Sequence, residues 1–144
     1  MTGGVRDTAI RIKLQEMAES VDMVEEHLPD SADSFRQLGI VKDGIYKRTE
    51  YSIENVYDIC AILNADLHLG VPGTDEDILE NLVLHEVLAP AIRQNLKAMK
   101  GFRNIVVYHY GAIDDDLAFS ILKVHIDDFS LFRREVERFL QSVA

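Results

Sequence analysis

The sequence is poor in the features that mark secreted, membrane-bound or disulfide-stabilised proteins. Its 144 residues contain a single cysteine, Cys60, so an internal disulfide is excluded. No apolar run approaches the roughly 20 residues needed to cross a bilayer. The first residues, MTGGVRDTAIRIK, lack the apolar core of a signal peptide. These absences predict a cytoplasmic protein in a reducing compartment, with no membrane association.

The familiar motifs of metal and enzyme chemistry are also missing. The five histidines form no HExxH pair, and no paired Cys/His spacing that would hold zinc is present. There is no glycine-rich phosphate loop and no GxSxG nucleophile elbow. The sequence therefore predicts neither a metal site nor a cofactor. A solvated or structural role is the favoured interpretation of His27, His68, His85 and His125.

Positive charge is in the minority. The chain has 25 Asp and Glu against 15 Lys and Arg, which gives a formal net charge of −10. An average surface of this charge repels a phosphate backbone. Broad, non-specific binding of nucleic acid is therefore excluded, and any contact with RNA must be local.

Proline is rare, and its positions divide the chain into helical segments. The three prolines fall between periodic segments, at Pro29, Pro72 and Pro90. Apolar residues recur every three or four positions between them, which predicts amphipathic helices. The β-branched run at 105–107 is flanked by helical pattern, so we interpret it as helix. We expect helices over about 5–28, 32–38, 44–69, 75 onward, 90–110 and 114 to the C-terminus.

This pattern predicts an all-α protein, a mostly antiparallel bundle of four to five main helices. The length fits one domain over residues 1–144, large enough to bury a core without disulfides. Two helix starts carry specific signals. Thr74 and Asp77 match a capping box. The acidic run that begins at Asp114 is interpreted as a helix start rather than a metal site.

One stretch concentrates the reactive side chains, and it reads GFRNIVVYHY from Gly101 to Tyr110. At about 100° per residue, Arg103 and Tyr110 share one helix face, within about 20°. Tyr108 lies about 140° from Arg103, and His109 about 120° from it. Arg103 and His109 would therefore converge only if the helix ends near Gly111, or if a second copy of the chain supplies the partner.

This stretch resembles the HEPN superfamily, whose signature is an Arg, four to six residues and then a His, with Asn commonly after the Arg. It is most similar to the HepT toxins of the HepT/MntA toxin–antitoxin systems, whose helix typically carries GFRN, an aliphatic stretch and then His-x-Tyr. Aligned without gaps, Tyr110 falls on the family's Tyr. Tyr108 falls where the closer relatives carry His, and His109 comes one position later. The specific part of the resemblance is these ten residues, although a weaker resemblance covers most of the chain.

The residue types suit metal-independent cleavage of RNA. A His titrates in the range needed to take the 2′-hydroxyl proton, and an Arg fork can offset charge on the phosphorane. Arg103 and His109 are therefore the predicted catalytic pair. The resemblance implies an endoribonuclease acting on RNA such as tRNA or mRNA, and a homodimer with motif helices paired across a two-fold axis. The alternative from the residues alone is a structural Arg and His at a helix end.

The resemblance also implies regulation by a partner. In HepT-like toxins the motif Tyr, here Tyr110, receives AMP from the MntA antitoxin, a minimal nucleotidyltransferase. Tyr108 is the less favoured acceptor. The candidate supporting or RNA-binding residues are Asn104, Tyr108 and the basic stripe, defined as Arg93, Lys97 and Lys100, for which a solvated helix face is the alternative interpretation.

Two other functions remain open from the sequence. One is a non-catalytic partner or substrate-binding protein of the nucleotidyltransferase, built on the same bundle with a drifted motif. The other is a purely structural helical dimer. The position of His109 separates catalysis from binding, because a catalytic His must point at Arg103.

Overall fold

The computed structural model describes residues 4–144, and this part of the chain contains helices and no strands. The elements in order are α1 (Asp7–His27), α2 (Ala32–Arg36), α3 (Ile40–Asp66), α4 (Asp75–Leu84), α5 (Ile92–Tyr108), the 3-10 helix η1 (Tyr110–Ala112), α6 (Asp115–His125) and α7 (Asp128–Ser142). The predicted all-α class is confirmed. Within 4–144 no helix is both long and apolar enough to cross a bilayer.

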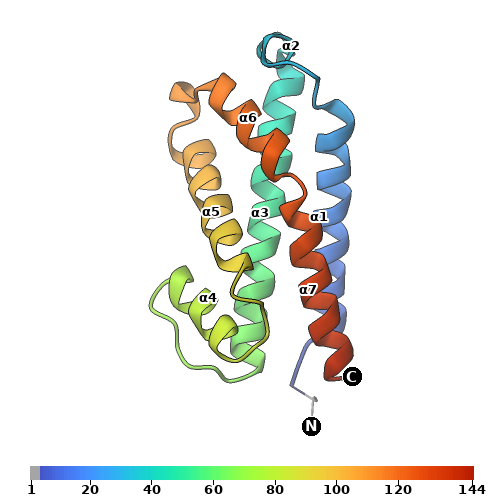
Figure 1. The fold of residues 1–144 in the computed structure, drawn as a ribbon, viewed down its shortest axis with the longest axis vertical. Helices are drawn as coiled ribbons and strands as arrows, with labels where there is room; N and C mark the ends of the chain where they lie inside the picture. Colours follow the sequence, from blue (N-terminus) through green and yellow to red (C-terminus); the bar gives the residue numbers. More distant parts are fainter. Residues whose placement is uncertain (1–3) are drawn as a thin grey trace.

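The long helices run antiparallel to one another. In Figure 1, α1 rises beside α3, α3 descends through the middle of the molecule, and α5 rises on the other side of α3. The short α4 lies at the lower end, between α3 and the start of α5. This arrangement lays the predicted motif helix along α3, so α3 supplies the side chains that face it.

The buried stripes follow the predicted spacing. In α5 the apolar residues at steps of three and four are buried, namely Ile92, Leu96, Met99, Phe102 and Val106. In α1 the same holds for Ile10, Leu14, Met17, Val21 and Val24. Burying one such side chain is worth about 1.5–3 kcal/mol. Cys60 is fully buried in α3, and burial raises the pKa of its thiol, in line with the predicted inert cysteine.

Two predicted helix starts are confirmed. The hydroxyl of Thr74 accepts a bond from the backbone N–H of Asp77, and the carboxylate of Asp77 accepts one from the N–H of Thr74, which completes the capping box. Asp114 caps α6, because its carboxylate accepts the N–H of Leu117 at 3.1 Å.

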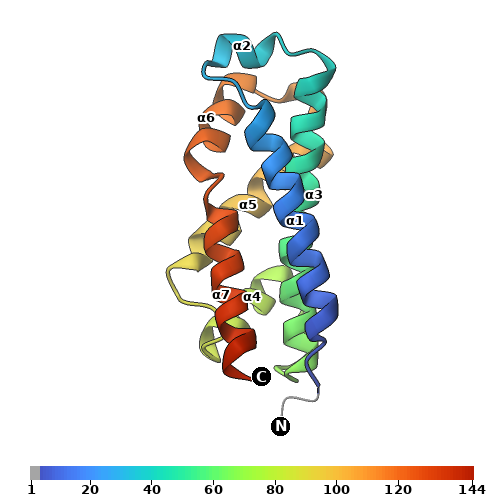
Figure 2. The same cartoon turned by 90° about the vertical axis from the view of Figure 1, so that its right-hand side faces the viewer.

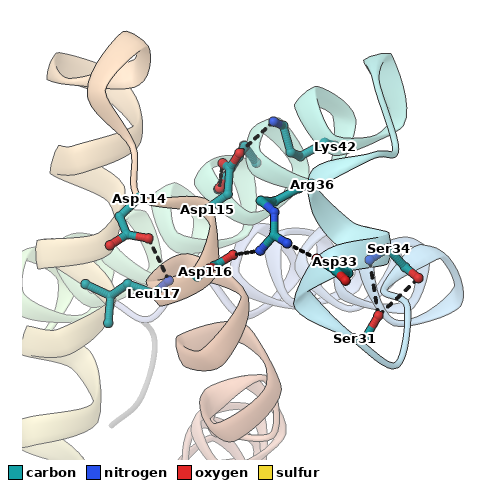
Figure 3. Close-up of polar contacts among 10 residues, drawn as sticks. Ser31, Asp33, Ser34, Arg36, Lys42, Asp114, Asp115, Asp116 and Leu117 are labelled. Atoms are coloured by element: carbon teal, nitrogen blue, oxygen red, sulfur yellow. Dashed lines mark hydrogen bonds and ion pairs between the residues drawn. The ribbon is translucent and has the colours of Figure 1, made fainter.

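The next two acids of that run are held by cations of neighbouring helices. Figure 3 shows Asp115 bound by Lys42 of α3, at 2.7 Å, and Asp116 bound by Arg36 of α2, which also contacts Asp33. The acidic run therefore serves as a helix start and as the electrostatic link between α6 and the α2–α3 corner.

The start of α3 differs from the prediction. The helix begins at Ile40, not near Gly44, and ends at Asp66. Gly39 adopts φ +62°, a conformation that L side chains rarely take, so the chain reverses there and the next residues are already helical. The N–H of Lys42 donates to the Gly39 carbonyl at 3.0 Å. The glycine was expected to end α2, and it also allows α3 to start at once.

The predicted single last helix is wrong. It is divided into α6, which ends at His125, and α7, which begins at Asp128, and Figure 2 shows the bend between them. No glycine or proline marks the bend. Its cause is tertiary, since α6 packs on α2 whereas α7 packs on α1 and α5. Leu122 and Phe129 are seven residues apart, so the apolar stripe continues across the bend and conceals it in the sequence.

Candidate active site

The motif stretch is anchored through its apolar side. Phe102 and Val106 are buried against the core, one turn of α5 apart. The residues between them, Arg103 and Asn104, are therefore turned to a partly exposed flank of the helix. The β-branched run at 105–107 is helical, as predicted, so Arg103 projects from regular helix.

Arg103 is held by an acid that the sequence analysis did not single out. Its guanidinium donates to Glu54 of α3 at 3.2 Å and to the side-chain oxygen of Asn104 at 3.4 Å. Partial burial acts to lower the pKa of Arg103, but Glu54 and the Tyr108 hydroxyl outweigh it, and the pKa is raised. Arg103 is therefore a permanent cation.

Tyr108 ends the helix that carries Arg103. The helical projection places the two side chains about 140° apart, and the Tyr108 hydroxyl contributes to the raised pKa of Arg103. Tyr108 is 69% exposed, so its ring is open to solvent beside the guanidinium.

A cavity of about 340 Å³ opens beside Arg103. Its lining carries two cations, Arg103 and Lys100, and three acids of α3 and α4, which are Glu54, Asp58 and Asp75. The cavity has room for a polar ligand, but the acids exceed the cations. An anion that enters it must compete with carboxylates for the guanidinium.

His109 lies at the end of the helix. Residue 109 caps α5, with its backbone at φ −131° and ψ 31° and its N–H donating to the Ile105 carbonyl at 2.9 Å. Its side chain is exposed. None of the hydrogen bonds or ion pairs found between residues 4 and 144 joins His109 to Arg103. A single chain therefore does not join the predicted catalytic pair by a hydrogen bond.

Tyr110 does not share a helix with Arg103, contrary to the prediction. The α-helix ends at Tyr108, and Tyr110 begins η1. Its hydroxyl donates to Asp43 of α3, and its ring meets that of Tyr46 edge-on, with centroids 5.8 Å apart. Burial and the bond to Asp43 raise the pKa of Tyr110 to about 12.

Four charged residues of α3 connect the surroundings of Tyr110 with those of Arg103. We call them the α3 charged stripe: Asp43, Lys47, Glu50 and Glu54. Their steps of four, three and four place them on one helix face. Asp43 binds Tyr110 at one end and Glu54 binds Arg103 at the other, about 16 Å away along the helix axis. This spacing was visible in the sequence, although its relation to α5 was not.

The basic stripe of Arg93, Lys97 and Lys100 is paired with acids of α4. These residues lie 2.7, 3.6 and 2.9 Å from carboxylate oxygens of Glu80, Glu76 and Asp75, in that order. The expected local positive potential is therefore cancelled in this conformation. These three acids lie against the stripe because α4 packs on α5.

No three His, Cys, Asp or Glu side chains gather into a set that could hold a metal ion anywhere in residues 4–144.

Comparisons with known proteins place this geometry in a family. A family model described as ribonuclease HepT-like matches residues 17–136. The mRNA nuclease HepT of Shewanella oneidensis is 28% identical over 98 residues, which are 68% of this chain and 74% of that protein.

Two solved structures share the fold. A toxin–antitoxin complex with AMP-PNP superimposes with a TM-score of 0.81 at 22% identity, over 90% of this chain and 97% of the other. The tri-AMPylated HEPN toxin of Shewanella oneidensis, in complex with the MNT antitoxin, gives 0.80 at 22% identity, over 90% and 96%. At this identity the likeness establishes the fold.

Proposed function

The chain belongs to the ribonuclease HepT-like family, and on that premise we propose that it is a toxin that cleaves RNA in the cytoplasm without a metal ion. We propose further that an MNT-type nucleotidyltransferase, its antitoxin, neutralises it by AMPylation. The observation that carries the proposal is Arg103, a permanent cation at the rim of a cavity, six residues before the His that caps the same helix.

In the proposed reaction, His109 takes the proton of a ribose 2′-hydroxyl, and Arg103 stabilises the charge that develops on the phosphorus centre. Asn104, Tyr108 and the basic stripe would position the RNA. To bind there, the RNA phosphates must displace the carboxylates that are paired with Arg103 and with the basic stripe. These ion pairs are partly exposed, so their loss has a small energetic cost.

The pair is proposed to act in a homodimer, since no hydrogen bond joins His109 to Arg103 within residues 4–144. Ile105 and Val107 lie off the buried stripe of α5, one on each flank of Val106, with 42% and 37% of their surface exposed. Apolar residues exposed beside a functional motif are typical of an interface. If two copies of α5 meet through them, the His of one copy can approach the Arg of the other.

Tyr110 is the proposed site of AMPylation. Its ring is 45% exposed, and its hydroxyl lies beside a cavity of about 320 Å³ that is separate from the one at Arg103. The adduct would add a negative phosphate and a nucleoside at the end of the α3 charged stripe. An anion at this position would repel RNA phosphates that approach along the α3 charged stripe.

A specific observation favours a second candidate function. Because Glu54 binds Arg103 and no hydrogen bond within residues 4–144 joins His109 to either, the same site suits a non-catalytic partner of the nucleotidyltransferase with a drifted motif. Expression in bacteria separates the two. We expect the wild type and Tyr108→Phe to arrest growth, and Arg103→Ala and His109→Ala not to. Equal growth with all four chains would support the binding protein.

The role of Tyr110 has its own test. Tyr110→Phe should remain toxic and should resist neutralisation when the nucleotidyltransferase is co-expressed, whereas Tyr108→Phe should still be neutralised. Mass spectrometry of the co-expressed pair identifies the modified residue. An adenylyl mass that persists in Tyr110→Phe would remove the assignment.

A further inference from the structure

The hydroxyl of Tyr110 already has a proton acceptor and a neighbouring cation within this chain. We propose that Asp43 and Lys47 of α3 assist the AMPylation of Tyr110, Asp43 by accepting the hydroxyl proton and Lys47 by binding the transferred phosphate. The inference rests on the proposed function, in which Tyr110 is the acceptor of AMP. It assigns part of the chemistry to the toxin rather than to the partner enzyme.

The position of Tyr110 is fixed by two contacts with α3. Its ring packs edge-on against Tyr46, with an interplanar angle of 85°. Tyr46 is itself held by a 2.6 Å bond from its hydroxyl to Asp115. The second contact is the bond that the Tyr110 hydroxyl donates to Asp43. The oxygen is therefore presented in one orientation, with its proton directed at a carboxylate.

The chemistry requires such an acceptor. A neutral phenol is a weak nucleophile, and contacts that favour its neutral form make spontaneous ionisation at pH 7 rarer still. In the proposed step the phenol oxygen of Tyr110 attacks the α-phosphorus of a nucleoside triphosphate. The bond from that phosphorus to pyrophosphate breaks, pyrophosphate leaves, and the hydroxyl proton passes to Asp43. A positioned base of this kind contributes about 100- to 10,000-fold to a rate.

The incoming phosphate enters a mostly acidic environment. The cavity beside Tyr110 is lined by Asp43, Lys47, Glu50 and Val106. Asp115 of α6 also acts electrostatically on the phenol. Lys47 is the only cation among these groups, and its present partner is Glu50, at 3.1 Å in an exposed ion pair. An α-phosphate at Tyr110 can replace Glu50 as the partner of Lys47, because the present ion pair is weak.

The experiment measures AMPylation rates of the purified full chain with an MNT-type nucleotidyltransferase, ATP and Mg²⁺, by intact mass. Asp43→Asn keeps the size of the side chain but cannot accept the proton, so we expect a loss of about 100-fold or more. Lys47→Gln should lose less, about 10-fold, because its charge is screened by water. Glu50→Gln is the matched control, and it should react at the wild-type rate or faster.

Two readouts separate chemistry from misfolding. Affinity for the partner should be the same for Asp43→Asn and the wild type. The AMPylation rate of Asp43→Asn should also rise about tenfold per pH unit between about pH 7 and 9. Without the carboxylate, the reaction depends on the fraction of Tyr110 that has already lost its proton to solvent, and this fraction grows with pH.

The possible results either support the inference or overturn it. A wild-type rate for Asp43→Asn, with Tyr110 modified, would overturn the inference and leave the proposed function intact. A low AMPylation rate of Asp43→Asn would also overturn the inference if the variant binds the partner poorly, or if its rate does not change with pH. A wild type that is not modified at Tyr110 would overturn both the inference and the proposed neutralisation.

Discussion

The guanidinium of Arg103 and the carboxylate of Glu54 form an ion pair at 3.2 Å across the contact between α5 and α3. Both side chains are about one-third exposed, so an RNA phosphate that reaches Arg103 must compete with this carboxylate. In the proposed function Glu54 is therefore an internal competitor of RNA, held by the fold beside Arg103.

Removal of this competitor should tighten RNA binding. We expect Glu54→Gln to lower the dissociation constant for a short RNA by about 2- to 5-fold, the range set by a partly exposed ion pair. Fluorescence anisotropy at fixed salt measures it. Glu137→Gln, which removes the acid paired with Arg133 on α7, is the matched control and should change nothing. Weaker binding by Glu54→Gln would show that Glu54 positions Arg103 instead of competing for it.

Asp115 should stabilise the fold in a pH-dependent way. It accepts bonds from Lys42 at 2.7 Å and Tyr46 at 2.6 Å. Partial burial acts to raise the pKa of Asp115, but these two donors outweigh it and the pKa is lowered. Because the folded value lies below the unfolded one, about 3.9, the stabilisation is present above that pH and is lost as the pH falls through the folded value.

We therefore expect Asp115→Asn to reduce the free energy of unfolding at pH 7 by about 1.5–3 kcal/mol. The difference from the wild type should narrow below about pH 4. Urea unfolding at several pH values measures it. Asp116→Asn, at the more exposed neighbouring acid, should cost less than about 1 kcal/mol. A deficit of Asp115→Asn that is the same at pH 7 and at low pH would contradict the assignment.

Association of the chain should depend on the exposed apolar residues of α5, Ile105 and Val107. The substitution Ile105→Lys places a charge at one of them, and an unpaired charge is costly to bury. Sedimentation at micromolar concentration should therefore show a monomer in place of the dimer. Ile12→Lys, at a 56% exposed position of α1, should leave the dimer intact. A monomeric wild type, or a dimer that survives Ile105→Lys, would remove the proposed interface.

The sequence predicts what is decided locally. The buried stripe of α5, the Thr74 capping box and the cap at Asp114 depend on residues a few positions apart, and each is present. The resemblance to the family is also drawn from ten contiguous residues, and the family model matches residues 17–136. Local spacing is thus sufficient for the fold class and for the choice of Arg103, His109 and Tyr110 as candidates.

The parts that the sequence does not reveal depend on contacts between distant segments. Glu54 precedes Arg103 by 49 residues, and Asp43 precedes Tyr110 by 67. The end of α5 at Tyr108 has no breaker of its own, since Gly111 comes three residues later. The chain leaves the helix where Tyr110 meets α3, and this contact invalidates the helical projection that joined Tyr110 to Arg103.

The central claim is that Arg103 and His109 cleave RNA without a metal ion, and the most direct measurement is cleavage of labelled RNA by the purified chain in excess EDTA. We expect the wild type to cut and to retain its rate in the chelator. Arg103→Ala and His109→Ala should each lose about 100-fold or more while melting at the wild-type temperature. Cleavage that stops in EDTA, or that persists in both alanine variants, would contradict the claim.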